Sequence, residues 1–202
     1  MLVLYSGPGF LLAADGVRQV TDGDIARVSR CLSPGYAKTL VRKNRRSTDE
    51  SVSAALLLLD MLSVRGREPS EVIRGEQGKP FFRSSGLSFS LSHDGGAVIC
   101  ALSDAQVGAD LMALPVRFGA DRQLAVARRF FTPEEAAELE RASGTPGSEQ
   151  LFAEFWTERE AVSKRAGGAL GDWLGKPLPK DAEFYRFVFR LAGNSYLSSV
   201  CL

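Results

Sequence analysis

The segment LSFSLSHDGGAVICAL, from Leu87 to Leu102, decides the fold class of the first half of the chain. Two apolar runs rich in strand-forming residues flank Gly95-Gly96, and a glycine pair in this position is typical of a hairpin turn. The segment therefore predicts two antiparallel strands. His93, the only histidine of the chain, lies between the two strands, just past the end of the first. A lone histidine is more often structural than functional, but small neighbours at a strand end favour a side chain that reaches a cleft.

Helices and further short strands are expected on both sides of this hairpin in the sequence. Ser47 to Glu50 matches a capping box, and leucines at helical spacing follow it. Thr132-Pro133 opens another strongly marked helix, with Glu135 at the capping-box position. Residues 36–46 form a basic segment for which a helix is one interpretation. The expected strands cover 2–6, 87–91, 97–102, 107–111, 183–191 and 196–201, and the expected helices cover 22–32, 47–64, 124–130, 133–143 and 149–166.

The frequent turns between these elements favour an α+β fold. Each half of the chain combines helices with a small, mostly antiparallel sheet, and connections this short leave no room for a doubly wound parallel sheet. The length of 202 residues permits one large domain or two small ones. We therefore expect two halves, residues 1–105 and 106–202.

The composition is that of an ordinary globular protein. Hydrophobic residues make up 45% and charged residues 24%, which excludes disorder, collagen and coiled coil for the chain as a whole. The 25 basic and 24 acidic residues leave a formal net charge of +1, so no nucleic-acid partner is expected. The basic stretch from Arg42 to Arg46 is either a solvated turn or a site for an anion or an acidic partner.

Cysteine usage and hydropathy favour a cytoplasmic location. Cys31, Cys100 and Cys201 are far apart and odd in number, which argues against a disulfide framework or structural zinc. The N-terminus lacks the basic region of a signal peptide. The longest aliphatic block, from Ala54 to Leu59, is far shorter than the ~20 residues that span a membrane. We therefore expect a cytoplasmic protein with no membrane partner.

Two groups of charged residues are candidates for chemistry. Asp110 lies in an apolar strand, where burial of its carboxylate needs compensation by a salt bridge, by a backbone cap or by a hard cation such as Mg²⁺. Glu160 and Lys164 are four residues apart, and this spacing alone favours a surface ion pair. The preceding Phe155-Trp156 and the following Gly167-Gly168 instead favour a closely packed helix with room for a ligand at its end.

Five short motifs follow one another along the chain: GKPFF at 78–82, SLSH at 90–93, VGAD at 107–110, RFFTPEE at 129–135, and FWTERE at 155–160 followed by Lys164. In this order they resemble the signature of the 4′-phosphopantetheinyl transferases. The chain length is similar to that of the longer, single-chain type, which resembles the enzyme that activates surfactin synthetase. The resemblance implies an α+β pseudo-dimer of two similar halves, acting as a monomer, with the active site in the cleft between them.

The same resemblance implies a reaction and a role for each site residue. The enzyme would transfer the phosphopantetheine arm of coenzyme A to a serine of an acidic acyl or peptidyl carrier protein, releasing 3′,5′-ADP and using Mg²⁺. Asp110, Glu160 and Lys164 form the implied catalytic group. The resemblance assigns Mg²⁺ to Asp110 and Glu160, and the serine proton to Glu160 or to a metal-bound water near it. It assigns the phosphates of coenzyme A to Lys164, and the 3′-phosphate to His93 with help from Lys79, Arg45 and Arg46. Arg159 is a further expected coenzyme A contact.

Three positions depart from the family pattern. Met112 occupies the place of a second acid, Arg159 replaces a lysine, and Asp94 follows His93 where serine is common. Asp94 would either stabilise a charged imidazole or repel a phosphate. Glu135 matches a family acid near the metal, but a helix cap is the simpler interpretation. These departures keep two alternatives open: a relative that binds coenzyme A or a carrier protein without transfer, and a nucleotide-phosphate hydrolase.

Overall fold

The computed structural model describes all residues from 1 to 202. In chain order, its elements are β1 (Leu2–Ser6), β2 (Phe10–Gly16), α1 (Asp22–Cys31), α2 (Pro34–Leu40), α3 (Arg45–Val64), β3 (Val72–Arg74), β4 (Pro80–Phe82), β5 (Ser88–Asp94), β6 (Ala97–Ser103), β7 (Gly108–Leu114), α4 (Ala120–Phe130), α5 (Pro133–Ala142), α6 (Ser148–Ala166), the 3-10 helix η1 (Leu170–Asp172), β8 (Phe184–Leu191) and β9 (Asn194–Cys201). None of the helices has the length and apolar composition required to cross a membrane.

The strands form two main antiparallel sheets. The first has four strands in the order β1-β2-β6-β5, and the second has three in the order β7-β9-β8. A separate two-stranded ribbon pairs β3 with β4. The α+β prediction is therefore confirmed, and each main sheet is built within one of the expected halves. The two sheets differ in strand number, and the similarity of the halves stays a prediction.

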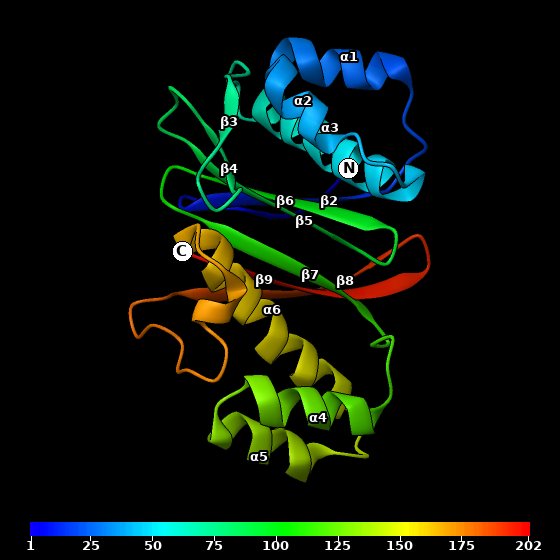
Figure 1. Ribbon diagram of the computed structural model, residues 1–202, viewed down its shortest axis with the longest axis vertical. Coiled ribbons are helices and arrows are strands. Elements are labelled where there is room, and N and C mark those ends of the chain that lie inside the picture. Colours follow the sequence, from blue (N-terminus) through cyan, green and yellow to red (C-terminus); the bar gives the residue numbers. More distant parts are fainter.

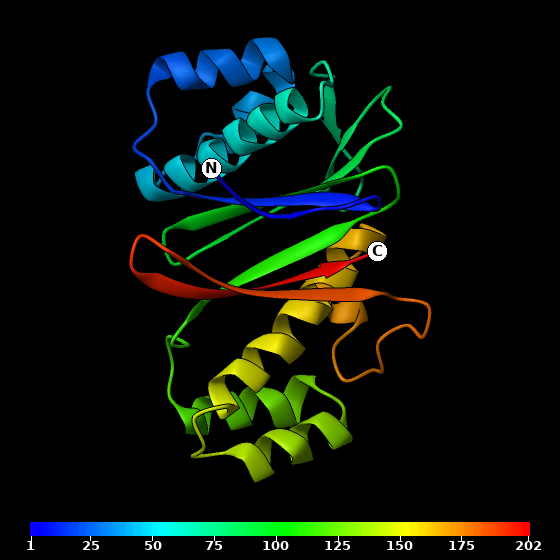
Figure 2. The same ribbon diagram turned by 180° about the vertical axis from the view of Figure 1, so that it is seen from behind.

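The two main sheets face each other in the middle of the molecule, and helices cover their outer faces (Figure 1). Helices α1, α2 and α3 lie on the first sheet, whereas α6 crosses the second sheet with α4 and α5 beyond it. The view from behind shows the same order of layers (Figure 2). Apolar clusters fill the space between α1–α3 and the first sheet, between the two sheets, and among α4–α6.

Side chains of β5 join the two sheets where this strand runs beside β7. The Ser90 hydroxyl accepts the Ala109 N–H at 2.9 Å, and the Ser92 hydroxyl donates to the Asp110 carboxylate at 2.7 Å. Asp94 also accepts a backbone N–H of β7. Alternate residues of a strand point to the same side, so Ser90, Ser92 and Asp94 form one row of hydrogen-bonding side chains. This row connects the halves without backbone pairing between β5 and β7.

Most expected elements are confirmed, with small shifts at their ends. The hairpin at Gly95-Gly96 is formed by β5 and β6, and Thr132 caps α5 in a capping box with Glu135. The expected capping box of Ser47 and Glu50 is wrong. Helix α3 begins earlier, at Arg45, because the Asn44 side chain caps it by accepting the Arg46 N–H.

Three strands, β2, β3 and β4, are missing from the expected elements. Strand β2 is buried from Phe10 to Ala14, so its apolar residues do not alternate with polar ones. Strands β3 and β4 have three residues each, too few for a periodic signal. The basic segment 36–46 is divided between α2, which ends at Leu40, and the first turn of α3.

Candidate active site

Helix α6 lies directly on strand β7 at Gly108. A Cβ atom on Gly108 would lie 1.9 Å from the Ala161 carbonyl oxygen, so a side chain at this position would prevent the contact. Alternation along β7 places Asp110 on the same side of the sheet as Gly108. Glu160 and Lys164 are one helical turn apart and share one face of α6. The close packing therefore brings a carboxylate of β7 next to two charged groups of α6.

Asp110 is held by two hydrogen bonds in a nearly buried position. Its Oδ1 accepts from Lys164 Nζ at 2.6 Å and from the Ser92 hydroxyl at 2.7 Å. Lys164 Nζ also donates to Ser92 Oγ at 3.0 Å, which closes a triangle of three polar groups. The Asp110 side chain is 10% exposed and the Lys164 side chain 29%. Lys164 pairs with Asp110 and not with Glu160, so the Glu160–Lys164 ion pair that the spacing alone favours is wrong.

The side-chain carboxylate of Glu160 forms no hydrogen bond or ion pair, although it lies close to this triangle. Burial raises the pKa of Glu160 above its ordinary value, and the negative charge of Asp110 raises it further, whereas Lys164 lowers it. A half-buried carboxylate with a raised pKa and no partner is poised to accept a proton or to bind a cation.

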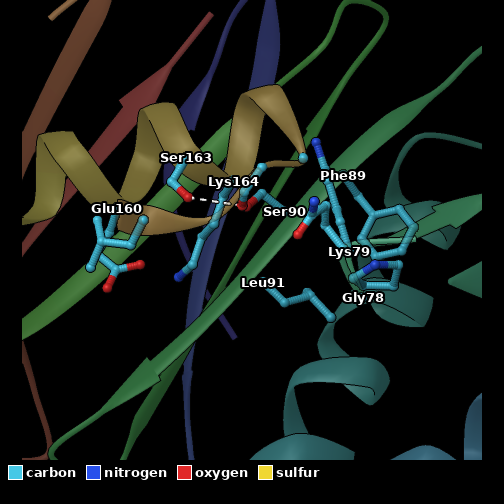
Figure 3. A pocket seen from close by; sticks show the side chains of 13 residues that line it. Gly78, Lys79, Phe89, Ser90, Leu91, Glu160, Ser163 and Lys164 are labelled. Atoms are coloured by element: carbon cyan, nitrogen blue, oxygen red, sulfur yellow. Dashed lines mark hydrogen bonds between the residues drawn. The ribbon is translucent and has the colours of Figure 1, made fainter. Parts of the chain in front are cut away.

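Two cavities open beside the polar triangle, and Glu160 lines both of them. The first, of about 330 Å³, lies between α6 and the segment that contains Lys79 and Leu91. Figure 3 shows Glu160 and Lys164 entering it from α6, with Lys79, Phe89 and Leu91 on the wall supplied by the other half. The second, of about 310 Å³, is bordered by His93 and by apolar side chains of the C-terminal half. Glu160 therefore lies between the two cavities.

His93 borders the second cavity and is linked to the start of α3. Its side chain is 42% exposed, and its Nδ1 lies 3.5 Å from Glu50 Oε2. The other oxygen of Glu50 accepts from Arg46 Nε at 3.0 Å. Arg46 therefore lies near His93 through a shared carboxylate, in agreement with the predicted grouping of these two residues.

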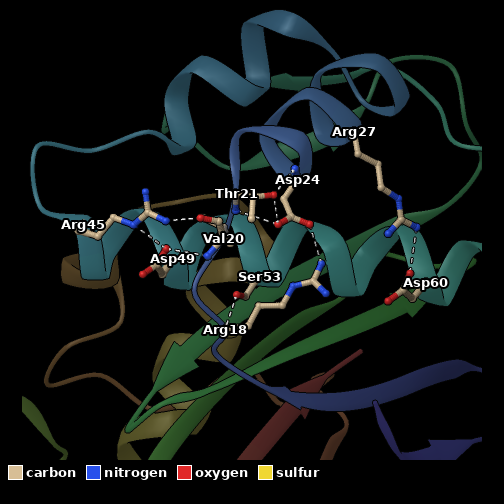
Figure 4. Close-up of polar contacts among 9 residues, drawn as sticks. All are labelled: Arg18, Val20, Thr21, Asp24, Arg27, Arg45, Asp49, Ser53 and Asp60. Carbon is tan, nitrogen blue, oxygen red and sulfur yellow. Dashed lines mark hydrogen bonds and ion pairs between the residues drawn. The ribbon is translucent and has the colours of Figure 1, made fainter.

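Arg45 has a different position from Arg46. It pairs with Asp49 at 3.1 Å and donates to the Val20 carbonyl, in the polar network that ties α1 to α3 (Figure 4). No contact connects Arg45 with His93. The structure therefore favours Arg46 over Arg45 as the early basic residue beside the cleft.

Lys79 crosses from the N-terminal half to the C-terminal half. Its Nζ donates to the Arg165 carbonyl at 3.1 Å and to the Val107 carbonyl at 3.4 Å, and burial lowers the pKa of Lys79. These acceptors are the end of α6 and the residue before β7. The Lys79 ammonium holds the two halves together, and its stem forms part of the first cavity wall.

Arg159 lies outside the cleft. Its side chain is completely buried, forms a bidentate ion pair with Glu135 and stacks on the ring of Phe131 at 4.9 Å. The assignment of Arg159 to coenzyme A is therefore wrong for this position. Successive residues of a helix point about 100° apart, so Arg159 leaves α6 on a different side from Glu160 and reaches Glu135. Glu135 combines its helix cap with this ion pair.

The other two departures also have defined places. Asp94 accepts the Ala113 N–H at 2.8 Å and pairs with Arg117, so its charge is compensated by β7 and the segment after it. Met112 lines the second cavity together with Asp110 and Glu160. It lies two residues beyond Asp110 on the same side of β7.

Two residues of the site, Ser92 and Glu50, were not assigned from the sequence. The alternation Ser88-x-Ser90-x-Ser92-x-Asp94 is a signal for Ser92, because it puts polar groups on one side of an otherwise apolar strand. Glu50 carries no such signal, since its partner His93 is distant in sequence.

The donor set of the cleft fits a hard cation. Asp110 and Glu160 offer carboxylate oxygens toward the same space, and Glu160 has no competing proton donor. Mg²⁺ is commonly held by one or two carboxylates together with water and substrate phosphates. No histidine, cysteine or further carboxylate lies with Asp110 and Glu160 as a third possible metal ligand.

The protein has an α+β fold with two halves that each build a sheet. A cluster of acidic and basic side chains lies at the cleft between these halves. Residues 106–198 match the family model of the 4'-phosphopantetheinyl transferase superfamily. The chain is 38% identical over 104 residues to the 4'-phosphopantetheinyl transferase AcpT of Salmonella typhimurium. This alignment covers 49% of this chain and 50% of AcpT. It is 36% identical over 112 residues to the 4'-phosphopantetheinyl transferase HetI of Nostoc, and this alignment covers 52% of this chain and 46% of HetI.

The C-terminal half of the chain is therefore similar to the 4'-phosphopantetheinyl transferase superfamily. It spans about half the length of the curated relatives it matches. The family match contains Asp110, Glu160 and Lys164, whereas Lys79 and His93 precede it.

Proposed function

We propose that this protein transfers the 4′-phosphopantetheine arm of coenzyme A to a serine of an apo carrier protein and releases 3′,5′-ADP. The observation that carries the proposal is the meeting of Asp110, Glu160 and Lys164 at a cleft lined by both halves. All three residues belong to the part of the chain that matches the superfamily. In phosphoryl transfer, the protein acts mainly by positioning groups and compensating charge.

The reaction needs a proton acceptor and positive charge at the same place. A bond forms from the serine oxygen to the phosphorus that carries the pantetheine arm, and the bond from this phosphorus to 3′,5′-ADP breaks. Glu160 takes the serine proton, and its raised pKa brings its proton affinity closer to that task. Lys164, already an ion-pair donor beside it, contacts the phosphates.

Asp110 and Glu160 would hold Mg²⁺ in this site, with phosphate oxygens and water as further ligands. When bound, the ion would neutralise charge on the pyrophosphate of coenzyme A. The Met112 thioether is a poor ligand for Mg²⁺, so the protein supplies two carboxylates and not three.

Coenzyme A would lie along the cleft between the two cavities. His93 and Arg46 are proposed to face its 3′-phosphate. Arg46 lies at the exposed start of α3, His93 lies near the end of β5, and both contact Glu50. Lys79 and Arg45 are proposed to stabilise the surroundings of this site. Lys79 holds the wall of the first cavity to α6, and Arg45 fixes the first turn of α3 to the loop at Val20.

The proposal extends to the partner and the setting. The basic stretch from Arg42 to Arg46 is exposed, which supports an acidic carrier protein as the partner. The three cysteines are free, which supports a cytoplasmic location. Two halves that complete one cleft within a single chain support a monomer.

The test combines the protein, Mg²⁺, coenzyme A and an apo carrier protein, followed by mass spectrometry of the carrier. We expect a gain equal to one phosphopantetheine, and near loss of this gain for Asp110→Asn and Glu160→Gln in folded protein. Coenzyme A bound without a change in carrier mass would indicate the non-catalytic alternative. Cleavage of coenzyme A in the absence of carrier would indicate a hydrolase.

A further inference from the structure

The carboxylate of Glu50 joins a guanidinium and an imidazole beside the cleft. Oε1 accepts from Arg46 Nε at 3.0 Å, and Oε2 lies 3.5 Å from His93 Nδ1. The Glu50 side chain is 14% exposed, whereas Arg46 is 66% and His93 42% exposed. The acid is therefore the sheltered centre of the group, and the two basic side chains extend from it toward solvent and the second cavity.

Helix stability does not account for this arrangement. The pair places Arg46 four residues before Glu50, which is the less favourable order for an ion pair along a helix. The first turn of α3 also contains Arg45 and no acidic residue, so two cations lie at the positive end of the helix dipole. An ion pair whose guanidinium is exposed, as that of Arg46 is, contributes little to folding. Positive charge gathered at a helix N-terminus is favourable when an anion binds there.

We propose that Glu50 is a positioning residue that orients His93 for the 3′-phosphate of coenzyme A. This inference rests on the proposed function. Glu50 Oε2 lies beside Nδ1. When both ring nitrogens carry a proton, this carboxylate holds the Nδ1 side of the ring and Nε2–H is left to donate to a phosphate oxygen. A carboxylate that holds the opposite ring nitrogen sets both the tautomer and the orientation of a histidine.

The charges around His93 are compatible with a bound anion. Arg46 compensates Glu50, and Arg117 together with the Ala113 N–H compensates Asp94. Of the two other acids that share the second cavity with His93 and Asp94, Asp110 is paired with Lys164 and Glu160 is half-buried. No acid near the ring is left both exposed and without a basic partner, so a phosphate at His93 meets the cations of the group.

The test compares coenzyme A with dephospho-coenzyme A as donors for carrier modification. Glu50→Met removes both the charge and the acceptor while preserving side-chain length and helix propensity. We expect it to lower the wild-type preference for coenzyme A, measured as the ratio of the two KM values, by about tenfold with a smaller change in kcat. Glu50→Gln keeps an acceptor oxygen and should retain part of the preference. Asp60→Asn, which breaks an α3 ion pair with Arg27, is the matched control.

The single histidine of the chain provides a second readout that does not depend on turnover. In ¹⁵N spectra of the neutral ring, we expect the proton on Nδ1 in the wild type and in Glu50→Gln, and on Nε2 in Glu50→Met. An unchanged KM ratio and an unchanged tautomer in Glu50→Met would overturn the inference. A wild-type protein that modifies no carrier would instead overturn the proposed function, and the tautomer would still report on Glu50.

Discussion

Replacement of Gly108 by alanine tests whether the contact between β7 and α6 aligns the site. The new Cβ would lie 1.9 Å from the Ala161 carbonyl oxygen and 2.4 Å from the Arg165 nitrogen. Both are backbone atoms, so no side-chain rotation relieves the clash. Contacts of this kind are tight between 3.0 and 3.4 Å, and the helix must therefore retreat by 1.1 to 1.5 Å.

This retreat has consequences for stability and for activity. Overpacking of a well-packed region costs about 1–3 kcal/mol, and we expect the upper part of that range because backbone has to move. Lys164 moves with α6, so its 2.6 Å contact with Asp110 would lengthen beyond hydrogen-bonding distance. A displacement of about 1 Å at reacting groups can cost on the order of a hundredfold in rate.

The assay measures urea unfolding and carrier modification on the same Gly108→Ala preparation. We expect a lower free energy of unfolding and a loss of turnover much larger than the unfolded fraction explains. Gly35→Ala is the control, because its Cβ on α2 would meet nothing within 4 Å. It should be neutral or stabilising by up to about 1 kcal/mol. Wild-type stability and turnover in Gly108→Ala would refute the close packing of α6 on β7.

Three further changes probe the charged groups. Lys164→Ala should raise the KM for coenzyme A strongly, and an unchanged value would restrict Lys164 to its ion pair with Asp110. Met112→Glu places a second carboxylate about 7 Å along the strand from Asp110, and we expect half-maximal transfer at lower Mg²⁺ concentration; an unchanged titration in folded protein would contradict this. Without metal, the raised pKa of Glu160 means that its ionisation costs stability at neutral pH and that this cost vanishes in acid. Glu160→Gln should therefore stabilise the metal-free fold in urea at neutral pH only, and an equal effect in acid would exclude ionisation as its cause.

Local patterns predict a large part of the fold. The hairpin at Gly95-Gly96 and the capped start of α5 depend on neighbouring residues, and both are confirmed. Strand β2 is missed because burial on both faces removes the alternation that marks a strand. The start of α3 is misplaced because Asn44 and Ser47 both suit a cap, and only the three-dimensional course of the chain selects Asn44.

The site is predictable where helix or strand geometry relates its residues. The four-residue spacing of Glu160 and Lys164 correctly places both on one face of α6. The same geometry separates Arg159 from them, although a motif treats the three as one group. The contact of Glu50 with His93 joins α3 to β5 across the fold, so no local pattern contains it.

The measurement that tests the central claim most directly is the parallel quantification of 3′,5′-ADP and modified carrier protein in one reaction. We expect equal molar amounts of the two products, and neither product when the carrier serine is replaced by alanine or when Glu160→Gln replaces the wild type. Release of 3′,5′-ADP in excess of modified carrier, or its release without carrier, would contradict transfer at the cleft of Asp110, Glu160 and Lys164.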